Sequence, residues 1–294
     1  MRSKPFGSLI ILAILLLSGS SSSAQNRPCN VDPLTLQFEG SPVEQAKCLL
    51  RPNGYGGILG AELTKLPAPL DRSIGTKVNI PVSKLLKYLA AQNISETDIG
   101  GPLSHTLASA TLPNGQAVPS IYFVIHDTST PNLKDELFPA EMDSDAAWRG
   151  NNLSVWMNSP VAHVFVARTG TSVTTTLFNQ SVNKGWGTKF AREKLRSDAK
   201  GLQIHIELVQ PRRRDPRSSN PNNDLIAPDP GFSKAQYDRL ALLYLAASIR
   251  RGTWMIPAYH SAVDAGIKDA HDDPQNFDLN SFASSLDHLI KAVK

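Results

Sequence analysis

Four residues near the C-terminus have types and spacing suited to binding a metal ion. His260, His271, Asp272 and Asp273 lie within one fourteen-residue stretch of the segment 259–279. A loop can fold back on itself, so an imidazole and a later carboxylate can reach the same cation. Zn²⁺ accepts both kinds of ligand, and a catalytic zinc keeps one coordination position for water. The alternative is a solvated acidic loop whose two histidines bind nothing.

Three further polar residues lie on or directly after predicted strands. The apolar run that ends at Ile125 predicts a strand, and His126 follows it directly. In the alternating run 201–209, His205 and Glu207 fall on one face. A buried carboxylate on a strand costs free energy unless it is paired or takes part in chemistry. Glu207 is therefore a candidate catalytic residue, and His205 is a candidate partner or substrate contact.

The first 24 residues have the pattern of a signal peptide. Arg2 and Lys4 precede the apolar run 9–17, which is too short to span a bilayer, and small residues lead up to Ala24. We expect cleavage after Ala24. No later segment is long and apolar enough to cross a membrane, so we expect an exported protein without a transmembrane segment. No cysteine follows the apolar run closely, so a lipid anchor is not expected.

The composition gives little sign of a charged partner. The chain has 30 basic and 26 acidic residues, and the loss of Arg2 and Lys4 with the leader lowers its formal charge from +4 to +2. Such a small excess is a weak argument for an anionic partner, and nucleic-acid binding is not expected. The roughly 270 remaining residues suffice for one large domain or two small ones.

Cys29 and Cys48 are the only cysteines in the sequence. In an oxidising compartment a disulfide between them is the expected state. The bridge would tie the extended segment 31–38 to the helix after it and contribute about 3 kcal/mol in the chain-entropy model. A metal site built on the two thiols is less expected, because no other His or Cys lies near them in the sequence.

The remaining elements follow from apolar periodicity and from end signals. Strands are predicted at residues 106–112, 117–125, 161–168, 172–178 and 201–209. Turn residues connect the first two strands, and the next two form a hairpin. Helices are predicted at residues 42–50, 82–93, 233–252 and 279–289. The arginines at 212–214 are interpreted as solvated surface.

Several motifs occur in the order of a known enzyme family. They are IHDTS at His126, IHIELV at Glu207, AQYDRLALL in the helix from residue 233, YHSAVD at His260 and HDDPQNFD at Asp273. This arrangement resembles the zinc-dependent N-acetylmuramoyl-L-alanine amidases of type 2, a group that includes the peptidoglycan recognition proteins. The resemblance runs from about residue 120 to the C-terminus and implies an α/β fold with a mixed central β-sheet flanked by helices. It assigns residues 105–294 to a zinc amidase domain and leaves residues 25–104 as an N-terminal region of unknown role.

The resemblance also implies roles for particular residues. It matches the family's zinc ligands to His126, His260 and Asp273, and the family's catalytic Glu to Glu207. Many members carry a Lys two residues before the ligand Asp. That position is occupied here by His271, which we expect to assist the oxyanion.

Two departures from the family pattern bear on the site. The stretch between the last two ligands is longer than is common in the family, so Lys268 competes with His271 for the oxyanion role. The frequent Trp-His-Ala-Gly segment is altered to Lys-Gly-Trp-Gly. Its Trp186 is a candidate substrate contact together with His205.

The activity that the resemblance implies is hydrolysis. Family members use Zn²⁺ to cleave the amide bond between N-acetylmuramic acid and L-alanine in peptidoglycan or muropeptides, which would place the exported protein in the bacterial periplasm or outside the cell. One alternative is a non-catalytic peptidoglycan-binding protein, and another is a zinc hydrolase acting on a different amide. Neither HExxH nor GxSxG occurs, which disfavours a thermolysin-like protease and a triad hydrolase. The choice between intact wall and anhydro-muropeptides stays open, as does the oligomeric state.

Overall fold

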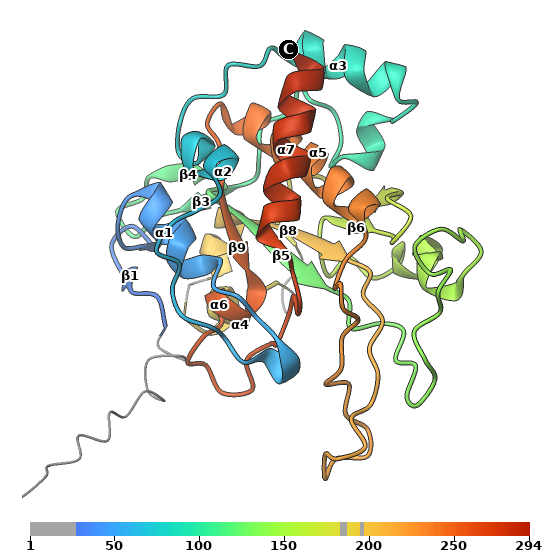
Figure 1. Ribbon diagram of the computed structural model, residues 1–294. Coiled ribbons are helices and arrows are strands. Elements are labelled where there is room, and N and C mark those ends of the chain that lie inside the picture. Colours follow the sequence, from blue (N-terminus) through green and yellow to red (C-terminus); the bar gives the residue numbers. More distant parts are fainter. Residues whose placement is uncertain (1–27, 183–186, 195–196) are drawn as a thin grey trace, which may run out of the picture.

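The computed structural model describes residues 28–182, 187–194 and 197–294, which are arranged around a five-stranded sheet (Figure 1). The strands run in the order β7-β6-β8-β5-β9. Their bounds are β5 Tyr122–Asp127, β6 Val164–Val166, β7 Ser172–Thr174, β8 Gln203–Leu208 and β9 Ile256–Tyr259. β7 is antiparallel to β6, whereas the other pairs are parallel. The predicted α/β class with a mixed central sheet flanked by helices is therefore confirmed.

The register of the parallel strands brings their polar ends together. His126 of β5 pairs with Glu207 of β8. Ile125 pairs with Tyr259 of β9, so the next residue, His260, reaches the same edge. Open α/β sheets bind ligands outside the carboxyl ends of their strands. Residues far apart in the sequence thus meet where such a site is expected.

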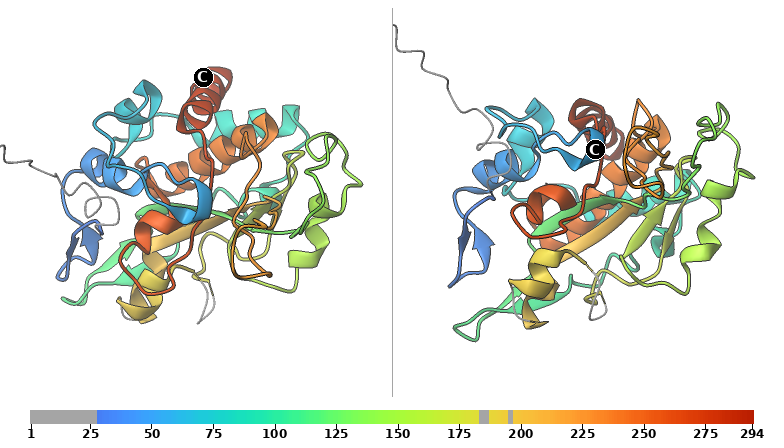
Figure 2. Two further views of the ribbon diagram at one scale, coloured as in Figure 1. Left: turned by 60° about the horizontal axis from the view of Figure 1, so that its bottom comes forward. Right: turned by 90° about the horizontal axis from the view of Figure 1, so that it is seen from below.

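Two long helices lie on one face of the sheet (Figure 2). They are α5 Lys234–Arg251 and α7 Leu279–Val293. The Tyr244 ring of α5 contacts Phe123 of β5 with ring centroids 5.3 Å apart, and α7 packs along α5. The predicted ends of α5 are confirmed. Ser233 and Gln236 form a capping box, and Gly252 ends the helix at φ 81°, a left-handed conformation that suits glycine.

The N-terminal region packs against the β9 edge and against α7. Its elements are β1 Val31–Asp32, β2 Gln37–Phe38, α1 Pro42–Leu49, α2 Ala68–Ser73 and α3 Val82–Ala91. α1 contacts β9, whereas α2 and α3 contact α7. The predicted disulfide joins Cys29 to Cys48 and ties the β1–β2 pair to α1. One hydrophobic cluster includes Leu49 and Leu70 together with Phe123, so this region shares its core with the sheet.

Short elements connect the larger ones. They are β3 Ser109–Thr111, β4 Ala117–Pro119, α4 Lys189–Glu193, α6 His260–Val263 and the 3₁₀ helices Tyr55–Gly57, Glu96–Asp98, Arg149–Asn151, Leu153–Trp156 and Ser197–Leu202. The prediction of one continuous strand at 117–125 is wrong. The chain leaves the β3–β4 hairpin at Pro119, which has no N–H to donate, and enters the central sheet when Ile121 N–H donates to the Leu202 carbonyl. The predicted β6–β7 hairpin is confirmed, with shorter strands.

The predicted leader, residues 1–24, lies outside the described residues. In the part of the chain that is described, no helix is both long enough and apolar enough to cross a bilayer.

Candidate metal centre

Three predicted ligands meet at the carboxyl edge of the sheet. His126 lies in β5, His260 begins α6 directly after β9, and Asp273 lies in the loop between α6 and α7. The Nδ1 atoms of His126 and His260 are 2.8 Å apart. Asp273 Oδ1 is 3.0 Å from Nδ1 of His260, and its Oδ2 is 3.6 Å from Nδ1 of His126. All three side chains are buried, and their donor atoms lie close together, away from water.

This donor set fits a zinc ion. Ligand atoms at about 2.0–2.2 Å from a tetrahedral zinc lie about 3.3 Å from one another. With Oδ2 as the donor atom of Asp273, the three separations are 2.8, 3.2 and 3.6 Å, which scatter around that value. Three protein ligands would leave one of four positions for water or substrate, as in catalytic zinc sites. The structure thus contains a buried His/His/Asp group that could bind a metal ion.

Two carboxylates hold His260 from opposite sides. Asp264 Oδ2 lies 2.9 Å from Nε2 of the ring, whereas Asp273 contacts Nδ1. Burial alone would lower the pKa of His260, but the two carboxylates outweigh burial and raise this pKa to about 10. Asp273 raises this pKa most, and its negative charge lies on the Nδ1 side of the ring, where a metal cation would also be attracted.

Asp264 was not among the residues predicted from the sequence. It is fully buried and accepts the backbone N–H groups of Lys189 at 3.0 Å and Phe190 at 2.8 Å. Burial would raise the pKa of Asp264, but contacts with His260 and His271 hold it below its ordinary value. A carboxylate on the far nitrogen of a ligand His fixes the orientation of the ring. The signal that could have found Asp264 is its position four residues after His260, one helical turn away.

A chain of histidines lies behind His126. His205 Nδ1 is 2.9 Å from Nε2 of His126, and the His205 backbone N–H donates to Nδ1 of His163. His163 Nε2 lies 2.9 Å from the Gln180 carbonyl, so this nitrogen carries a proton. Burial lowers the pKa of His126 and of His205 well below the ordinary value, and neighbouring imidazoles lower it further. The predicted residue His205 thus lies against a candidate ligand and is only 1% exposed.

Glu207 faces the candidate ligands from β8. Its Oε1 is 3.9 Å from Nδ1 of His126, and its Oε2 is buried without a hydrogen-bond partner among the described residues. Burial raises the pKa of Glu207 well above its ordinary value, and Asp273 raises it further. A carboxyl group with a buried oxygen that lacks a hydrogen bond, beside a possible metal site, is a candidate for function. Trp186, the other predicted substrate contact, lies outside the described residues.

His271 lies against His260. The two rings stack with centroids 4.1 Å apart and planes 24° apart, and His271 Nδ1 is 3.2 Å from Asp264 Oδ2. The His271 side chain is 43% exposed, so it borders both the buried ligands and solvent. Lys268 is exposed, and its backbone carbonyl accepts a hydrogen bond from Nζ of Lys189. Of the two predicted oxyanion residues, His271 is the one that touches a candidate ligand within the described chain.

Arg212 corrects the interpretation of residues 212–214 as solvated surface. Its side chain is fully buried, and its Nη2 lies 2.7 Å from Oδ2 of Asp127. Its Nη1 lies 3.6 Å from Oδ2 of Asp272. Burial raises the pKa of Asp127 to about 6, although Arg212 opposes this rise. The buried guanidinium is balanced by the carboxylates of Asp127 and Asp272, and nothing in the sequence pairs these residues with Arg212.

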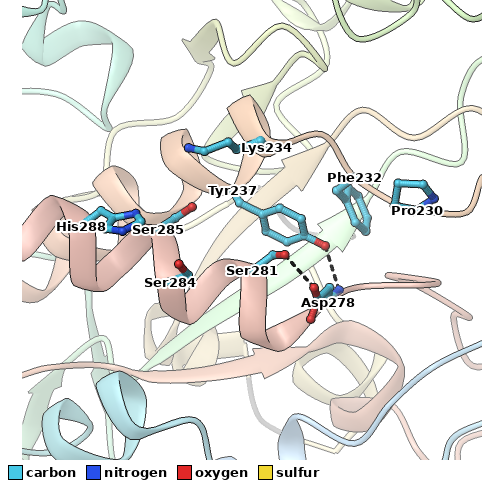
Figure 3. Close-up of a pocket in the computed structure, with 9 residues that line it drawn as sticks. All are labelled: Pro230, Phe232, Lys234, Tyr237, Asp278, Ser281, Ser284, Ser285 and His288. Carbon is cyan, nitrogen blue, oxygen red and sulfur yellow. Dashed lines mark hydrogen bonds between the residues drawn. The ribbon is translucent and has the colours of Figure 1, made fainter.

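A groove apart from these residues lies between α5 and α7 (Figure 3). It has a volume of about 350 Å³ and is lined by Phe232 and Tyr237 and by hydroxyl groups of α7. The Tyr237 hydroxyl accepts the backbone N–H of Asp278 at 2.7 Å, so this polar atom already has a partner. The groove contains none of the candidate metal ligands, which lie with Glu207 at the carboxyl edge of the sheet.

A second pocket, of about 500 Å³, adjoins the candidate metal centre. Its lining includes His271, Asp272 and Lys268 from the loop after α6, and Gly56 and Gly57 from the N-terminal region. Two segments that are distant in the sequence therefore form the walls beside the candidate ligands.

Comparisons of this chain with protein families, curated proteins and solved structures found no match.

Proposed function

We propose that this protein is a zinc-dependent hydrolase that cleaves the amide bond between N-acetylmuramic acid and L-alanine of peptidoglycan or muropeptides. The observation that supports the proposal is the buried convergence of His126, His260 and Asp273, with Glu207 beside them at the carboxyl ends of parallel strands. The order of the motifs around these residues supports the substrate class.

In this proposal, His126, His260 and Asp273 hold one zinc ion. When bound there, zinc lowers the pKa of a water ligand to about 7 and polarises the substrate carbonyl. Asp264 keeps His260 oriented, and His205 supports His126 in the same way.

Glu207 is the proposed general base. It accepts a proton from the attacking water and then delivers that proton to the amine nitrogen as the C–N bond breaks. Its position beside His126 and the unused oxygen Oε2 are the features that support this role.

His271 is the proposed donor to the oxygen that gains negative charge during attack. Its Nδ1 faces Asp264 at 3.2 Å, which orients the ring and leaves Nε2 for the substrate. Lys268 remains the alternative for this role.

Export is part of the proposal. A disulfide between Cys29 and Cys48 is typical of proteins in oxidising compartments. N-terminal sequencing of the exported protein is expected to begin at Gln25, and a mature protein that retains Met1 would contradict the predicted leader.

Digestion of purified peptidoglycan with and without a chelator, followed by mass analysis of the products, tests the activity. We expect stem peptides that begin with L-alanine, and their release should stop on chelation and return with added zinc. Binding of peptidoglycan without cleavage would favour a recognition protein. Bound zinc with neither binding nor cleavage would favour a hydrolase for another amide.

A further inference from the structure

Asn53 of the N-terminal region forms hydrogen bonds with residues at both ends of the loop that carries Asp273. Its Nδ2 donates to Oγ of Ser261 at 3.0 Å and to the backbone carbonyl of Asp272 at 2.6 Å. The backbone carbonyl of Asn53 accepts the backbone N–H of Asn276 at 2.9 Å. Asn53 is 5% exposed, so these bonds are shielded from water. They reach the residue after ligand His260 and the residue before ligand Asp273.

Gly57 contacts the same loop through its backbone. It has φ +74°, and a Cβ built on it would lie 2.2 Å from Cβ and 2.8 Å from Cα of Asp272. A side chain at position 57 would therefore push against the residue directly before Asp273. Only glycine allows this approach without moving the loop.

The loop needs such support because it has little structure of its own. Between α6 and α7, residues 264–278 form no helix or strand, and residues 268–271 are exposed. Ordering a loop costs conformational entropy, and a ligand on a disordered loop must meet that cost when the metal binds. If residues outside the loop hold it in place, the entropy cost of ordering the loop is met when the protein folds. Asp273 is then already in position when the metal binds.

We propose that residues 53–57 are a clamp that positions His260 and Asp273 for metal binding, with Asn53 and Gly57 as its positioning residues. The inference rests on the proposed metal site. It gives the N-terminal region a role in the site, since the clamp holds the loop without supplying a ligand.

Three glycines of this segment provide a matched series. Gly57→Ala brings both the left-handed backbone strain and the collision with Asp272. Gly56→Ala brings similar strain at φ +62°, but its nearest neighbour is Cδ2 of Leu225 at an ordinary 3.7 Å. Gly54→Ala brings neither, because φ is −117° and no atom lies within 4 Å of the added Cβ. The series separates contact with the loop from general destabilisation.

The experiment uses the full processed chain with its disulfide, stripped of metal and titrated with zinc against a chromophoric chelator. Gly57→Ala is expected to lower the zinc affinity about 10- to 100-fold, the range seen when the support of a metal ligand is removed. Gly56→Ala should lower the melting temperature but keep the zinc affinity, and Gly54→Ala should match the wild type. Hydrogen exchange of the metal-free protein should show faster exchange of residues 261–276 in Gly57→Ala than in Gly56→Ala.

A second variant keeps the test informative if Gly57→Ala does not fold. Asn53→Ala removes the two side-chain bonds to the loop and is expected to lower the zinc affinity in the same direction. Its control is Asn30→Ala, which removes an exposed hydrogen bond to Glu39 in the same region. If the wild type binds zinc and Asn53→Ala or a folded Gly57→Ala binds it equally well, the clamp is overturned while the proposed function stands. If the wild type binds no zinc, the metal site falls and the clamp falls with it.

Discussion

Glu207 combines two properties that a general base needs. It lies beside the candidate ligands, and its Oε2 is left unbonded by the described residues. Gln has the shape of Glu but cannot accept the proton of water, so Glu207→Gln isolates this function. We expect the variant to bind zinc like the wild type and to cleave peptidoglycan at least about 100-fold more slowly. Metal analysis and product release measure the two effects, and turnover close to the wild-type rate would remove Glu207 from the mechanism.

His205 is buried behind His126 and is expected to act through it. His205→Asn keeps an acceptor oxygen near the position of the imidazole Nδ1, whereas His205→Leu removes the acceptor. We expect the Leu variant to lose about 10- to 100-fold in zinc affinity and the Asn variant to retain most of it. Chelator competition measures both affinities. Equal losses in the two variants would show that the hydrogen bond to His126 is not what matters.

Residues with local motifs were easier to predict than residues whose partners are distant. The motifs around His126, His260 and Asp273 pointed to three residues that the fold does bring together, although their binding of zinc stays a prediction. Arg212 was misinterpreted because its partner Asp127 lies 85 residues away, and nothing in its own neighbourhood distinguishes it from the two arginines that follow. Only the fold decides which arginine of the three is buried.

In the proposed mechanism, the conformation of the loop between α6 and α7 determines whether His271 or Lys268 assists the oxyanion. The position two residues before the ligand Asp273, where many family members have a Lys, is His271. The family's spacing of that Lys after the second ligand His selects Lys268 instead. The stacking of His271 on His260 favours His271. We expect His271→Ala to lose about 100-fold in turnover, Lys268→Ala to lose far less, and both variants to retain zinc. A larger loss in Lys268→Ala, measured by the same peptidoglycan assay, would transfer the role to Lys268.

We expect Arg212 to stabilise this edge of the sheet by balancing the buried carboxylate of Asp127 and the partly buried carboxylate of Asp272. Arg212→Met removes the guanidinium and leaves Asp127 buried without its ion pair. We expect a loss of about 3–5 kcal/mol in the free energy of unfolding, measured by denaturant titration of the metal-free protein. Adding Asp127→Asn should restore most of that loss, because the unpaired charge is then gone. Losses that simply add in the double variant would contradict this explanation.

Helix ends were predicted more closely than strand ends, for a physical reason. Caps are local chemistry, so Ser41, Ser233 and Gly252 mark helix ends in the sequence as they do in the structure. A strand ends where its pairing ends, and pairing depends on a distant partner. The run predicted as a strand at 161–168 pairs with β7 only over Val164–Val166.

At the scale of the whole molecule, the mixed sheet with flanking helices was predictable, but the use of the N-terminal region was not. The fold class followed from the resemblance that the motifs carry, whereas the strand order and β9 itself were not predicted. The contact between Asn53 and Asp272 spans 219 residues and involves a common polar side chain in a loop. No periodicity or motif marks such a pair, so the proposed clamp could be inferred only from the structure.

Buried histidines should make the whole molecule sensitive to acid. Burial lowers the pKa of His163 to about 4, although the hydrogen bond that its Nε2 donates to the Gln180 carbonyl opposes the shift. In the unfolded chain this pKa returns to about 6.5. As pH falls, the unfolded chain therefore binds the proton first. The stability due to neutral His163 is complete above about pH 6.5 and is lost progressively as pH falls to about 4, with a total loss of about 3 kcal/mol.

His163→Gln removes this titration, so its free energy of unfolding should fall less between pH 7 and pH 4 than that of the wild type, by about 3 kcal/mol. Urea titrations of metal-free protein at a series of pH values measure the difference without a contribution from zinc release. His288→Gln is the matched control, because His288 is exposed on α7 and should follow the wild-type profile. Parallel profiles for His163→Gln and the wild type would mean that folded His163 takes up its proton over the same pH range as the unfolded chain. The acid sensitivity would then have to come from His126 and His205, whose neutral state is also imposed by burial.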